Sequence, residues 1–318
     1  MKILIVGTVN GLQNEGMRNV ITHFSKCFKK EHEVIYSALR DIGSSFALAK
    51  KSDIVIVCAR ASAKVYLLCR LLMFRTSRLF VLLVQRPEKW FVRLNNICTL
   101  KCDYLTIYGK DSEVLRSGPS RVYEVSVGID TLKFHPLRLD ERNHLKKKYG
   151  FDTVRPIVLH VGHCSTGRGL EDFCLIDKSS YQRVVVASGL FEDKTVIDML
   201  HESEVKLLTG FMPNIEELYQ IADVYLFPTK TTEYVISIPL SVMEALSCGT
   251  PVIAYNQLSS LSYIKTRRLN VLNIIETTLE LEQALEDSIS HKAEITLLDE
   301  CKSWDESAQE ILKFLKGC

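Results

Sequence analysis

The chain has 318 residues, of which 47% are hydrophobic and 25% charged, a composition typical of a folded globular protein rather than a disordered or fibrous one. This length suits two domains of ordinary size better than a single core. The net charge of +2 is unevenly distributed: residues 1–136 contain 21 Lys and Arg against 11 Asp and Glu, whereas residues 137–318 contain 19 against 27. The basic first half therefore predicts an anionic partner or surface.

The ten cysteines are scattered, and the nearest pair, Cys98 and Cys102, has no second pair or His cluster beside it. We therefore predict reduced thiols and no metal site. The opening stretch MKILIVGTVNG is too short for a signal peptide, and no stretch reaches the roughly 20 apolar residues of a membrane span. We expect a cytoplasmic protein.

Short apolar runs rich in β-branched residues alternate with helical patterns along the chain. In the first half the runs are 2–7, 33–36, 53–57, 78–84, 103–108 and 121–127. The helical patterns between them include 15–30, 44–51, 62–74 and 110–117. In the second half the runs are 155–162, 182–188, 204–210, 222–228 and 250–255. Continuous apolar strands separated by helices predict parallel sheets covered on both faces.

Residues 128–150 interrupt this alternation, because Pro136 and a run of charged residues stand there. We predict a linker in this stretch and a doubly wound α/β domain on either side of it. Ligands of such sheets bind at the carboxyl ends of the strands. Two such domains in tandem are expected to face a cleft.

Three stretches carry a family resemblance: GIDTLKFHP at 128–136, VGHCSTGRGLEDF at 161–173, and the segment 221–255. Together they resemble the retaining family 4 glycosyltransferases (glycosyl transferases group 1) of the GT-B fold. The resemblance implies a Rossmann-like acceptor domain over 1–137 and a Rossmann-like nucleotide-sugar-binding domain over 138–302. It also implies that the last helix, 303–318, crosses back to the first domain.

Glu244 is the one carboxylate on an otherwise apolar helical stretch, LSVMEALS. A carboxylate near a helix N-terminus is favoured by the helix dipole, which is one explanation. At the carboxyl end of a sheet, a carboxylate can also accept hydrogen bonds from both hydroxyls of a ribose while the helix N-terminus faces phosphate. The resemblance implies this second role, which we favour.

The turn VGHCSTGRG contains glycines that allow close backbone approach, and a guanidinium can hold phosphate oxygens with two hydrogen bonds. The family places an Arg and a Lys here to bind the donor diphosphate, and by position these become His163 and Arg168. Arg168 keeps the positive charge, whereas His163 keeps it only in part at neutral pH. We predict a phosphate role for Arg168; for His163, a histidine packed in the turn is an equal alternative.

Other donor contacts are expected from the first glycine loop and from the segment before Glu244. Family members often carry a second Glu eight positions earlier, near the donor sugar, where this chain has Ile236. Isoleucine cannot hydrogen-bond, so we expect the backbone that follows it to contact the sugar. Gly16 is predicted beside the diphosphate, with a structural helix-entry glycine as the alternative. The predicted donor-binding set is Gly16, His163, Arg168, Ser237, Ile238, Pro239, Leu240, Ser241 and Glu244.

Catalysis in such a site requires mainly electrostatic stabilisation of the departing diphosphate. We assign it to Arg168 and Glu244, name no side-chain nucleophile, and expect no metal or other cofactor. On the acceptor side, Gln85 and Arg86 follow the run at 78–84 and are the candidates.

Residues 60–101 contain nine basic residues and a single acidic one, Glu88, interleaved with Leu, Phe and Trp. This pattern suits the surface of an anionic membrane, which would imply a lipid-linked acceptor or a saccharide carried at the membrane. A buried helix at 65–74 with solvated arginines is the equal alternative. No nucleic-acid-binding motif accompanies the charge, so we expect no nucleic acid partner.

The predicted function is transfer of a sugar from a nucleotide-diphosphate donor to a saccharide or lipid-linked acceptor, with retention of anomeric configuration. Two alternatives stay open: a catalytically impaired binding subunit, suggested by Ile236, and a GT-B sugar-nucleotide epimerase. A nicotinamide dehydrogenase is disfavoured, because the glycines after the first strand do not follow GxGxxG.

Overall fold

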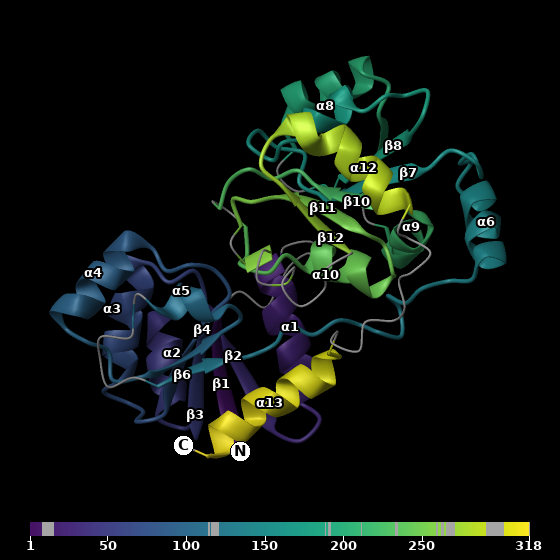
Figure 1. The fold of residues 1–318 in the computed structure, drawn as a ribbon. Coiled ribbons are helices and arrows are strands. Elements are labelled where there is room, and N and C mark those ends of the chain that lie inside the picture. Colours follow the sequence, from purple (N-terminus) through teal and green to yellow (C-terminus); the bar gives the residue numbers. More distant parts are fainter. Residues whose placement is uncertain are drawn as a thin grey trace. The chain divides into compact units, whose positions relative to one another are not determined.

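The computed structural model describes residues 1–7, 16–113, 115, 121–187, 189, 192–210, 212–232, 235–258, 260, 261, 264, 271–290 and 302–317. The chain divides into two compact units (Figure 1). Unit 1 consists of Met1–Gly128, Tyr234–Ile238 and Lys302–Cys318, and unit 2 of Ile129–Glu233 and Pro239–Cys301. The predicted domain boundary, between residues 137 and 138, differs from the observed one, which follows Gly128. Residues 234–238 also belong to unit 1, whereas the sequence predicts them in the second domain.

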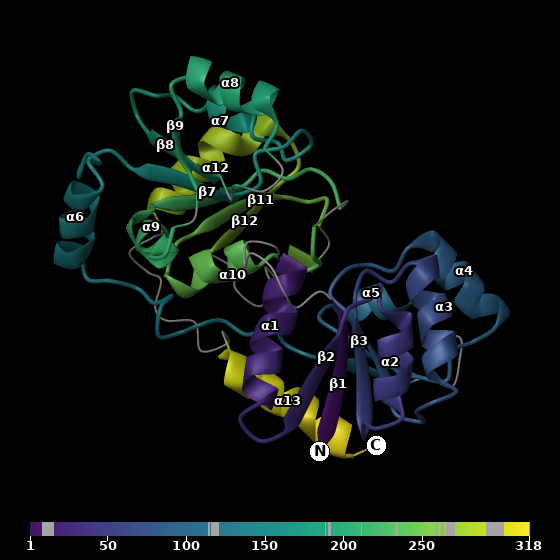
Figure 2. The ribbon, with the colours of Figure 1, turned by 180° about the vertical axis from the view of Figure 1, so that it is seen from behind.

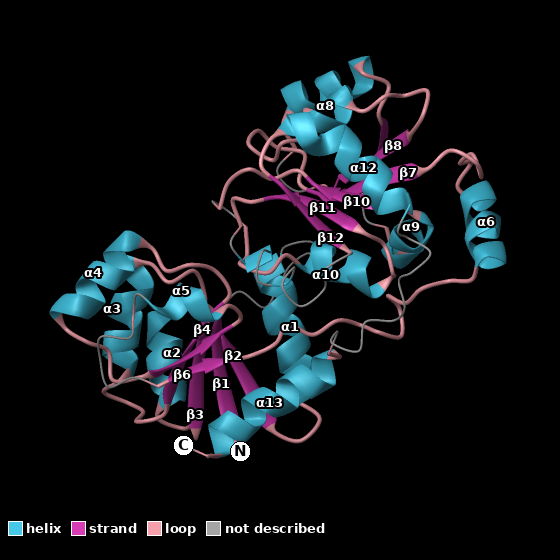
Figure 3. Cartoon of the chain, in the orientation of Figure 1, coloured by secondary structure: helices cyan, strands magenta, loops and turns pink. Residues whose placement is uncertain are grey.

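Unit 1 is built on a parallel six-stranded sheet in the order β2-β1-β3-β4-β5-β6 (Figure 3). Its strands are β1 (Lys2–Gly7), β2 (Glu33–Ser37), β3 (Ile54–Cys58), β4 (Leu79–Leu83), β5 (Asp103–Thr106) and β6 (Val122–Glu124). Its helices are α1 (Gly16–Phe28), α2 (Ile42–Ala49), α3 (Ala63–Leu72), α4 (Lys89–Ile97), α5 (Gly109–Glu113) and α13 (Trp304–Lys316). The chain goes outward from β1 to β2 and then continues from β3 to the opposite edge, which is the doubly wound order that the sequence predicts.

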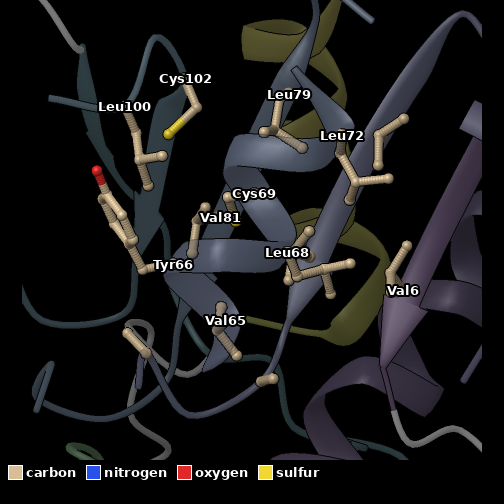
Figure 4. Packing of buried hydrophobic residues seen from close by; sticks show 14 of the residues in the cluster. Val6, Val65, Tyr66, Leu68, Cys69, Leu72, Leu79, Val81, Leu100 and Cys102 are labelled. Carbon is tan, nitrogen blue, oxygen red and sulfur yellow. The ribbon is translucent and has the colours of Figure 1, made fainter. Parts of the chain in front are cut away.

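The core of unit 1 shows why α3 forms and where it packs. Ser62 caps the helix by accepting a hydrogen bond from the amide of Val65. Its apolar residues recur every three or four positions, so one face is buried while Leu67 on the other is 63% exposed. Figure 4 shows the buried face packed with strand β4 and with the chain leading into β5. The members labelled there are Val6, Val65, Tyr66, Leu68, Cys69, Leu72, Leu79, Val81, Leu100 and Cys102.

The last helix, α13, belongs to unit 1, as the sequence predicts. Ser303 and Glu306 form a capping box that fixes its start. The Trp304 ring then stacks on His23 at 4.5 Å between ring centroids and meets Phe24 edge-on. Gly128 lies against it so closely that a Cβ atom there would come within 2.4 Å of the Trp304 Cα.

Unit 2 contains a second parallel six-stranded sheet, in the order β12-β11-β10-β7-β8-β9. Its strands are β7 (Ile157–Gly162), β8 (Gln182–Ala187), β9 (Lys206–Thr209), β10 (Val224–Phe227), β11 (Val252–Tyr255) and β12 (Leu272–Ile275). Its helices are α6 (Leu139–Lys148), α7 (Asp172–Leu175), α8 (Lys194–Glu202), α9 (Ile215–Ile221), α10 (Leu240–Ser247) and α12 (Leu281–Ser290), with a short 3-10 turn at Thr278–Glu280. The predicted second α/β domain is therefore present.

Helix α6 corrects the prediction of a linker over 128–150. Its sequence, LDERNHLKKK, is polar all round and shows no apolar stripe, so it resembles a solvated connection. Long-range ion pairs hold it instead: Arg142 and Lys146 both bind the carboxylate of Asp223, at 2.8 and 2.9 Å. Arg142 also donates to the carbonyl of Gln220 at 2.9 Å, at the end of α9.

Two further expectations concern thiols and membranes. The eight cysteines in the described part of the chain are free thiols, as predicted, and burial raises the pKa of Cys102 to about 12. None of the described helices combines the length and the apolar character needed to cross a bilayer.

Candidate functional site

The sheet of unit 2 has a point where its strand order reverses. The chain goes from β7 outward to β8 and β9, and from β10 outward to β11 and β12 on the other side. β7 and β10 therefore lie side by side, paired in parallel, and the chain leaves their carboxyl ends in opposite directions. Open α/β sheets bind their ligands at this point. Here the two strands end at Gly162 and Phe227.

The turn that follows β7 is fixed on both sides. Gly169 has a left-handed backbone (φ +74°), and a Cβ atom there would lie 2.0 Å from the carbonyl oxygen of Pro228, directly after β10. Only glycine permits this contact between the two strand ends. On the other side, the amide of Asp193 donates to the carbonyl of Cys164 at 2.7 Å. Arg168 and His163 therefore stand on an anchored turn.

Tyr225 in β10 lies within reach of the charges of Arg168 and Glu244, which act in opposite directions on the pKa of its buried phenol. The Tyr225 hydroxyl donates to the carbonyl of Val161 at 3.2 Å, near the end of β7, and also interacts with Ser241 of α10. Partial burial lowers the pKa of Arg168, although a guanidinium stays charged at neutral pH. The structure thus brings Arg168, Ser241 and Glu244 of the predicted set together around one buried tyrosine.

Glu244 lies in the second turn of α10 and is partly buried. Burial raises the pKa of its carboxyl group to about 7, while the Tyr219 hydroxyl and the charge of Lys133 act in the opposite direction. Tyr219 faces this carboxylate without good hydrogen-bond geometry. Pro239 directly precedes α10, and Leu240 is the first residue of the helix and 9% exposed.

Three buried polar atoms in the described part of unit 2 have no hydrogen-bond partner: His160 Nε2, Tyr219 Oη and Thr229 Oγ1. His160 belongs to β7, Thr229 to the loop after β10, and Tyr219 to helix α9, which packs beside α10. A buried polar atom without a partner costs about 1–3 kcal/mol, so such atoms are retained where a ligand or water can satisfy them. Together, these atoms mark the region around β7 and β10 as a binding site.

The loop after β10 is anchored by residues that the sequence analysis did not select. Lys230 donates to the carboxylate of Asp172 at 2.7 Å, and the hydroxyl of Tyr255 donates to the same carboxylate at 2.5 Å. The Lys230 ammonium also lies 4.7 Å from the centre of the Tyr255 ring. The only sequence signal for this cluster is a lysine in the loop after β10, two residues beyond Pro228.

Three residues of the predicted donor-binding set lie in unit 1: Gly16, Ser237 and Ile238. Gly16 begins α1, and a Cβ atom there would lie 3.1 Å from the side chain of Ile236. Ile236 is 7% exposed. The residue at the position of the missing Glu is therefore a buried apolar contact of Gly16 within unit 1.

Ser237 is bound to unit 1 through two hydrogen bonds. Its amide donates to the carbonyl of Val84 at 2.9 Å, and its hydroxyl donates to the carboxylate of Asp111. Burial raises the pKa of Asp111, which the bond from Ser237 and the charge of Arg86 oppose. The acceptor-side candidates Gln85 and Arg86 follow Val84 at the carboxyl end of β4, also in unit 1. No sequence pattern points to Asp111, because one acidic residue at a helix start carries no special signal.

Comparison with known proteins identifies the family. The model for glycosyl transferases group 1 matches residues 141–311, more than half of the chain, and the chain belongs to this family. Two solved structures share its fold over almost the whole length of both chains. HepE of Anabaena, in complex with UDP, has a TM-score of 0.75 at 13% identity and covers 100% of each chain. WaaG, a glycosyltransferase involved in lipopolysaccharide biosynthesis, has a TM-score of 0.69 at 13% identity and covers 99% of this chain and 100% of its own. The fold is GT-B.

Curated relatives match with higher identity but over a smaller part of the chain. The chain is 24% identical over 219 residues to the D-inositol 3-phosphate glycosyltransferase of Rhodococcus opacus, covering 61% of this chain and 48% of that protein. It is 25% identical over 134 residues to the alpha-galactosylglucosyldiacylglycerol synthase of Streptococcus pneumoniae, covering 39% and 35%. The chain thus matches less than half the length of either relative.

Proposed function

We propose that this protein is a retaining glycosyltransferase of family 4, which moves a hexose from a nucleoside diphosphate to a saccharide or lipid-linked acceptor. The proposal rests on the side chains found near the carboxyl ends of β7 and β10. There, a guanidinium, a carboxylate and three unpartnered buried polar atoms surround the point at which α/β sheets bind ligands. Because HepE has been crystallised with UDP and with UDP-glucose, UDP-sugars are the first donors to test.

In the proposed mechanism, Glu244 accepts hydrogen bonds from the ribose hydroxyls and Arg168 binds the diphosphate, with His163 beside it. When the bond between the anomeric carbon and the diphosphate oxygen breaks, negative charge collects on the diphosphate and positive charge on the sugar. A preorganised guanidinium lowers this barrier because it needs no reorganisation as the charge develops. The acceptor hydroxyl oxygen then bonds to the anomeric carbon on the face that the nucleotide leaves, and its proton passes to the departing diphosphate. We assign no side-chain nucleophile and no resident metal.

Replacing Glu244 by Gln is expected to weaken donor binding by about 1–3 kcal/mol at pH 8, because two hydrogen bonds to an ionised group become bonds to a neutral one. The pKa of about 7 gives a second signature. The natural chain loses its ionised carboxylate below pH 7, so its affinity is expected to rise by up to about ten-fold from pH 6 to pH 8. Glu244→Gln removes that rise.

The measurement is isothermal calorimetry with UDP-, GDP- and ADP-sugars. Glu202→Gln, an exposed change on α8, is the matched control. Unchanged affinity and an unchanged pH profile in Glu244→Gln would exclude the ribose role. Failure of the natural chain to bind any of the nucleotides would contradict the proposed function itself.

We further propose that α3 and α4 of unit 1 bind an anionic membrane surface. The two helices lie side by side in both ribbon views (Figures 1 and 2), and Tyr66 meets Phe91 edge-on between them. Their outer faces and the chain after α3 expose Leu67, Phe74, Trp90 and Ile97, at 60–79%. Exposed cations accompany them: Lys64, Arg75, Lys89 and Arg93. Apolar side chains among cations are typical of an anionic interface, where each cation contributes about 1 kcal/mol.

Charge reversal tests this surface. The natural chain is expected to float with phosphatidylglycerol vesicles at low salt, and the triple variant Lys64→Glu, Lys89→Glu, Arg93→Glu is expected to abolish that flotation. Arg78 is left unchanged, because its guanidinium donates to the carbonyl of Leu315 in α13. The control reverses three exposed lysines elsewhere in unit 1, Lys26, Lys313 and Lys316. Equal loss of flotation in both variants would mean that net charge, and not this surface, binds the lipid.

A further inference from the structure

His160 is a buried histidine of β7 that the proposed mechanism does not use. It is 2% exposed, and its Nδ1 lies 3.1 Å from the carbonyl oxygen of Leu226 in β10. A carbonyl oxygen can only accept, so Nδ1 carries the proton and Nε2 has a free lone pair. No residue in the described ranges provides a hydrogen bond to Nε2.

The imidazole leans along β7 toward the carboxyl end of the strand. A Cβ atom at Gly162, the last residue of β7, would lie 2.7 Å from Nε2, so glycine at this position leaves room for the ring. Aromatic rings enclose it from two elements: Phe173 of α7, and Tyr225 and Phe227 of β10, at 6.1–6.5 Å between ring centroids. The titratable groups on these two elements are the Tyr225 phenol of β10 and, in α7, Cys174 and Asp172, whose carboxylate accepts hydrogen bonds from Lys230 and Tyr255.

The charged groups that act on His160 come from the turn after its own strand. In the described chain they are Arg168 and His163. Burial among apolar rings, followed by the charges of Arg168 and His163, lowers the pKa of His160 to about 4, against the hydrogen bond to Leu226. The free protein therefore holds a neutral imidazole with an unused lone pair next to a cationic turn. An anion bound to that turn offsets the two charges and favours the protonated ring.

We propose that His160 is a positioning residue that takes up a proton on Nε2 when a nucleoside diphosphate sugar binds to the turn after β7. This inference rests on the proposed function, since it needs a diphosphate at Arg168. The proton comes from solvent and returns to it when the nucleotide leaves, and no covalent bond to carbon or phosphorus changes. The Nδ1–H group keeps its hydrogen bond to the carbonyl of Leu226, so the ring does not move. The protonated imidazole then adds a positive charge next to Gly162.

The size of the effect follows from linkage. Burial, which a bound anion does not remove, is the largest cause of the low pKa of His160. If the bound diphosphate offset the whole shift and returned this pKa to about 6.5, this group alone would lower donor affinity about 30-fold between pH 5 and pH 8, which is the upper limit of the effect. Uptake of at most about one proton per donor is then expected at about pH 5.3. Glu244 contributes with the opposite sign, so the effect of His160 is the difference between variants measured at the same pH.

The test uses calorimetric titration of the full chain with UDP-glucose, or with whichever of GDP-mannose and ADP-glucose binds more tightly. These donors carry a diphosphate diester that does not titrate between pH 5 and pH 8. The variants are His160→Gln, which keeps a donor for Leu226 but does not titrate, and His160→Phe, which fits the aromatic surroundings. His201→Gln, an exposed change at the end of α8, is the control. Titrations in two buffers of different ionisation enthalpy give the proton count directly.

The expected result is a pH 5 to pH 8 affinity ratio that is larger, by up to about 30-fold, in the natural chain and in His201→Gln than in both His160 variants. Proton uptake disappears with His160. Equal ratios and equal proton counts in all four proteins would overturn the inference and leave the proposed function intact. Absence of binding by the natural chain at every pH, with all three donors, would contradict the proposed function and this inference with it.

Discussion

Replacing Arg168 by Ala is expected to lower kcat of the proposed sugar transfer by about 10²–10³-fold, with a smaller effect on donor KM. Arg168 stands on a turn that Gly169 and Asp193 hold in place, so its guanidinium is aimed before the reaction begins. Its contribution is greatest when negative charge collects on the departing diphosphate, and the loss of one such preorganised donor costs about this much. The measurement is initial-rate kinetics with a radiolabelled donor.

Two variants make this prediction specific. Arg168→Lys keeps the charge but not the two-pronged geometry, so it is expected to recover part of the rate. Arg155→Ala removes an exposed arginine that pairs with Asp152, before the amino-terminal end of β7, and is expected to leave the rate unchanged. If Arg168→Ala raised the donor KM and left kcat unchanged, Arg168 would contribute to donor binding alone.

Replacing Asp223 by Ala is expected to destabilise unit 2 by about 3–5 kcal/mol. Its carboxylate accepts hydrogen bonds from Arg142 at 2.8 Å, from Lys146 at 2.9 Å and from the amide of Ile157, the first residue of β7, at 2.9 Å. The side chains of Asp223, Arg142 and Lys146 are only 14%, 15% and 7% exposed. Removing the anion leaves two buried cations without compensation, which costs far more than a surface pair.

The unfolding measurement must report on unit 2. Both tryptophans of the chain, Trp90 and Trp304, lie in unit 1, so tryptophan fluorescence does not follow the unfolding of unit 2. Far-UV circular dichroism in urea, together with amide hydrogen exchange in β7 and β10, follows the unfolding of unit 2. Asp140→Ala, which breaks an exposed pair with Arg138, is the control and is expected to change stability by less than about 1 kcal/mol. Similar losses in the two variants would show that the buried network contributes no more than a surface pair.

Much of the fold can be predicted from the sequence because its signals are local. Strand β3, IVIVC, and strand β7, IVLHVG, are nearly continuous apolar runs, which mark strands covered on both faces. The turn with Arg168 and the helix with Glu244 were likewise selected from short motifs. Helix α6 was not, because its stability comes from Asp223, more than seventy residues along the chain.

The sequence by itself determined the two parallel sheets and the family, and it predicts a donor site at the carboxyl ends of the strands, beside Arg168 and Glu244. Only the tertiary structure decided which strands meet there and which buried side chains they bring with them. His160, Thr229 and Tyr219 look in the sequence like ordinary members of apolar segments, and their unpartnered polar atoms are visible only once β7 pairs with β10. The tertiary structure also decided that Ile236 packs against Gly16 in unit 1. The physical reason is that strand pairing and side-chain burial depend on contacts between residues far apart in the chain, which no local pattern records.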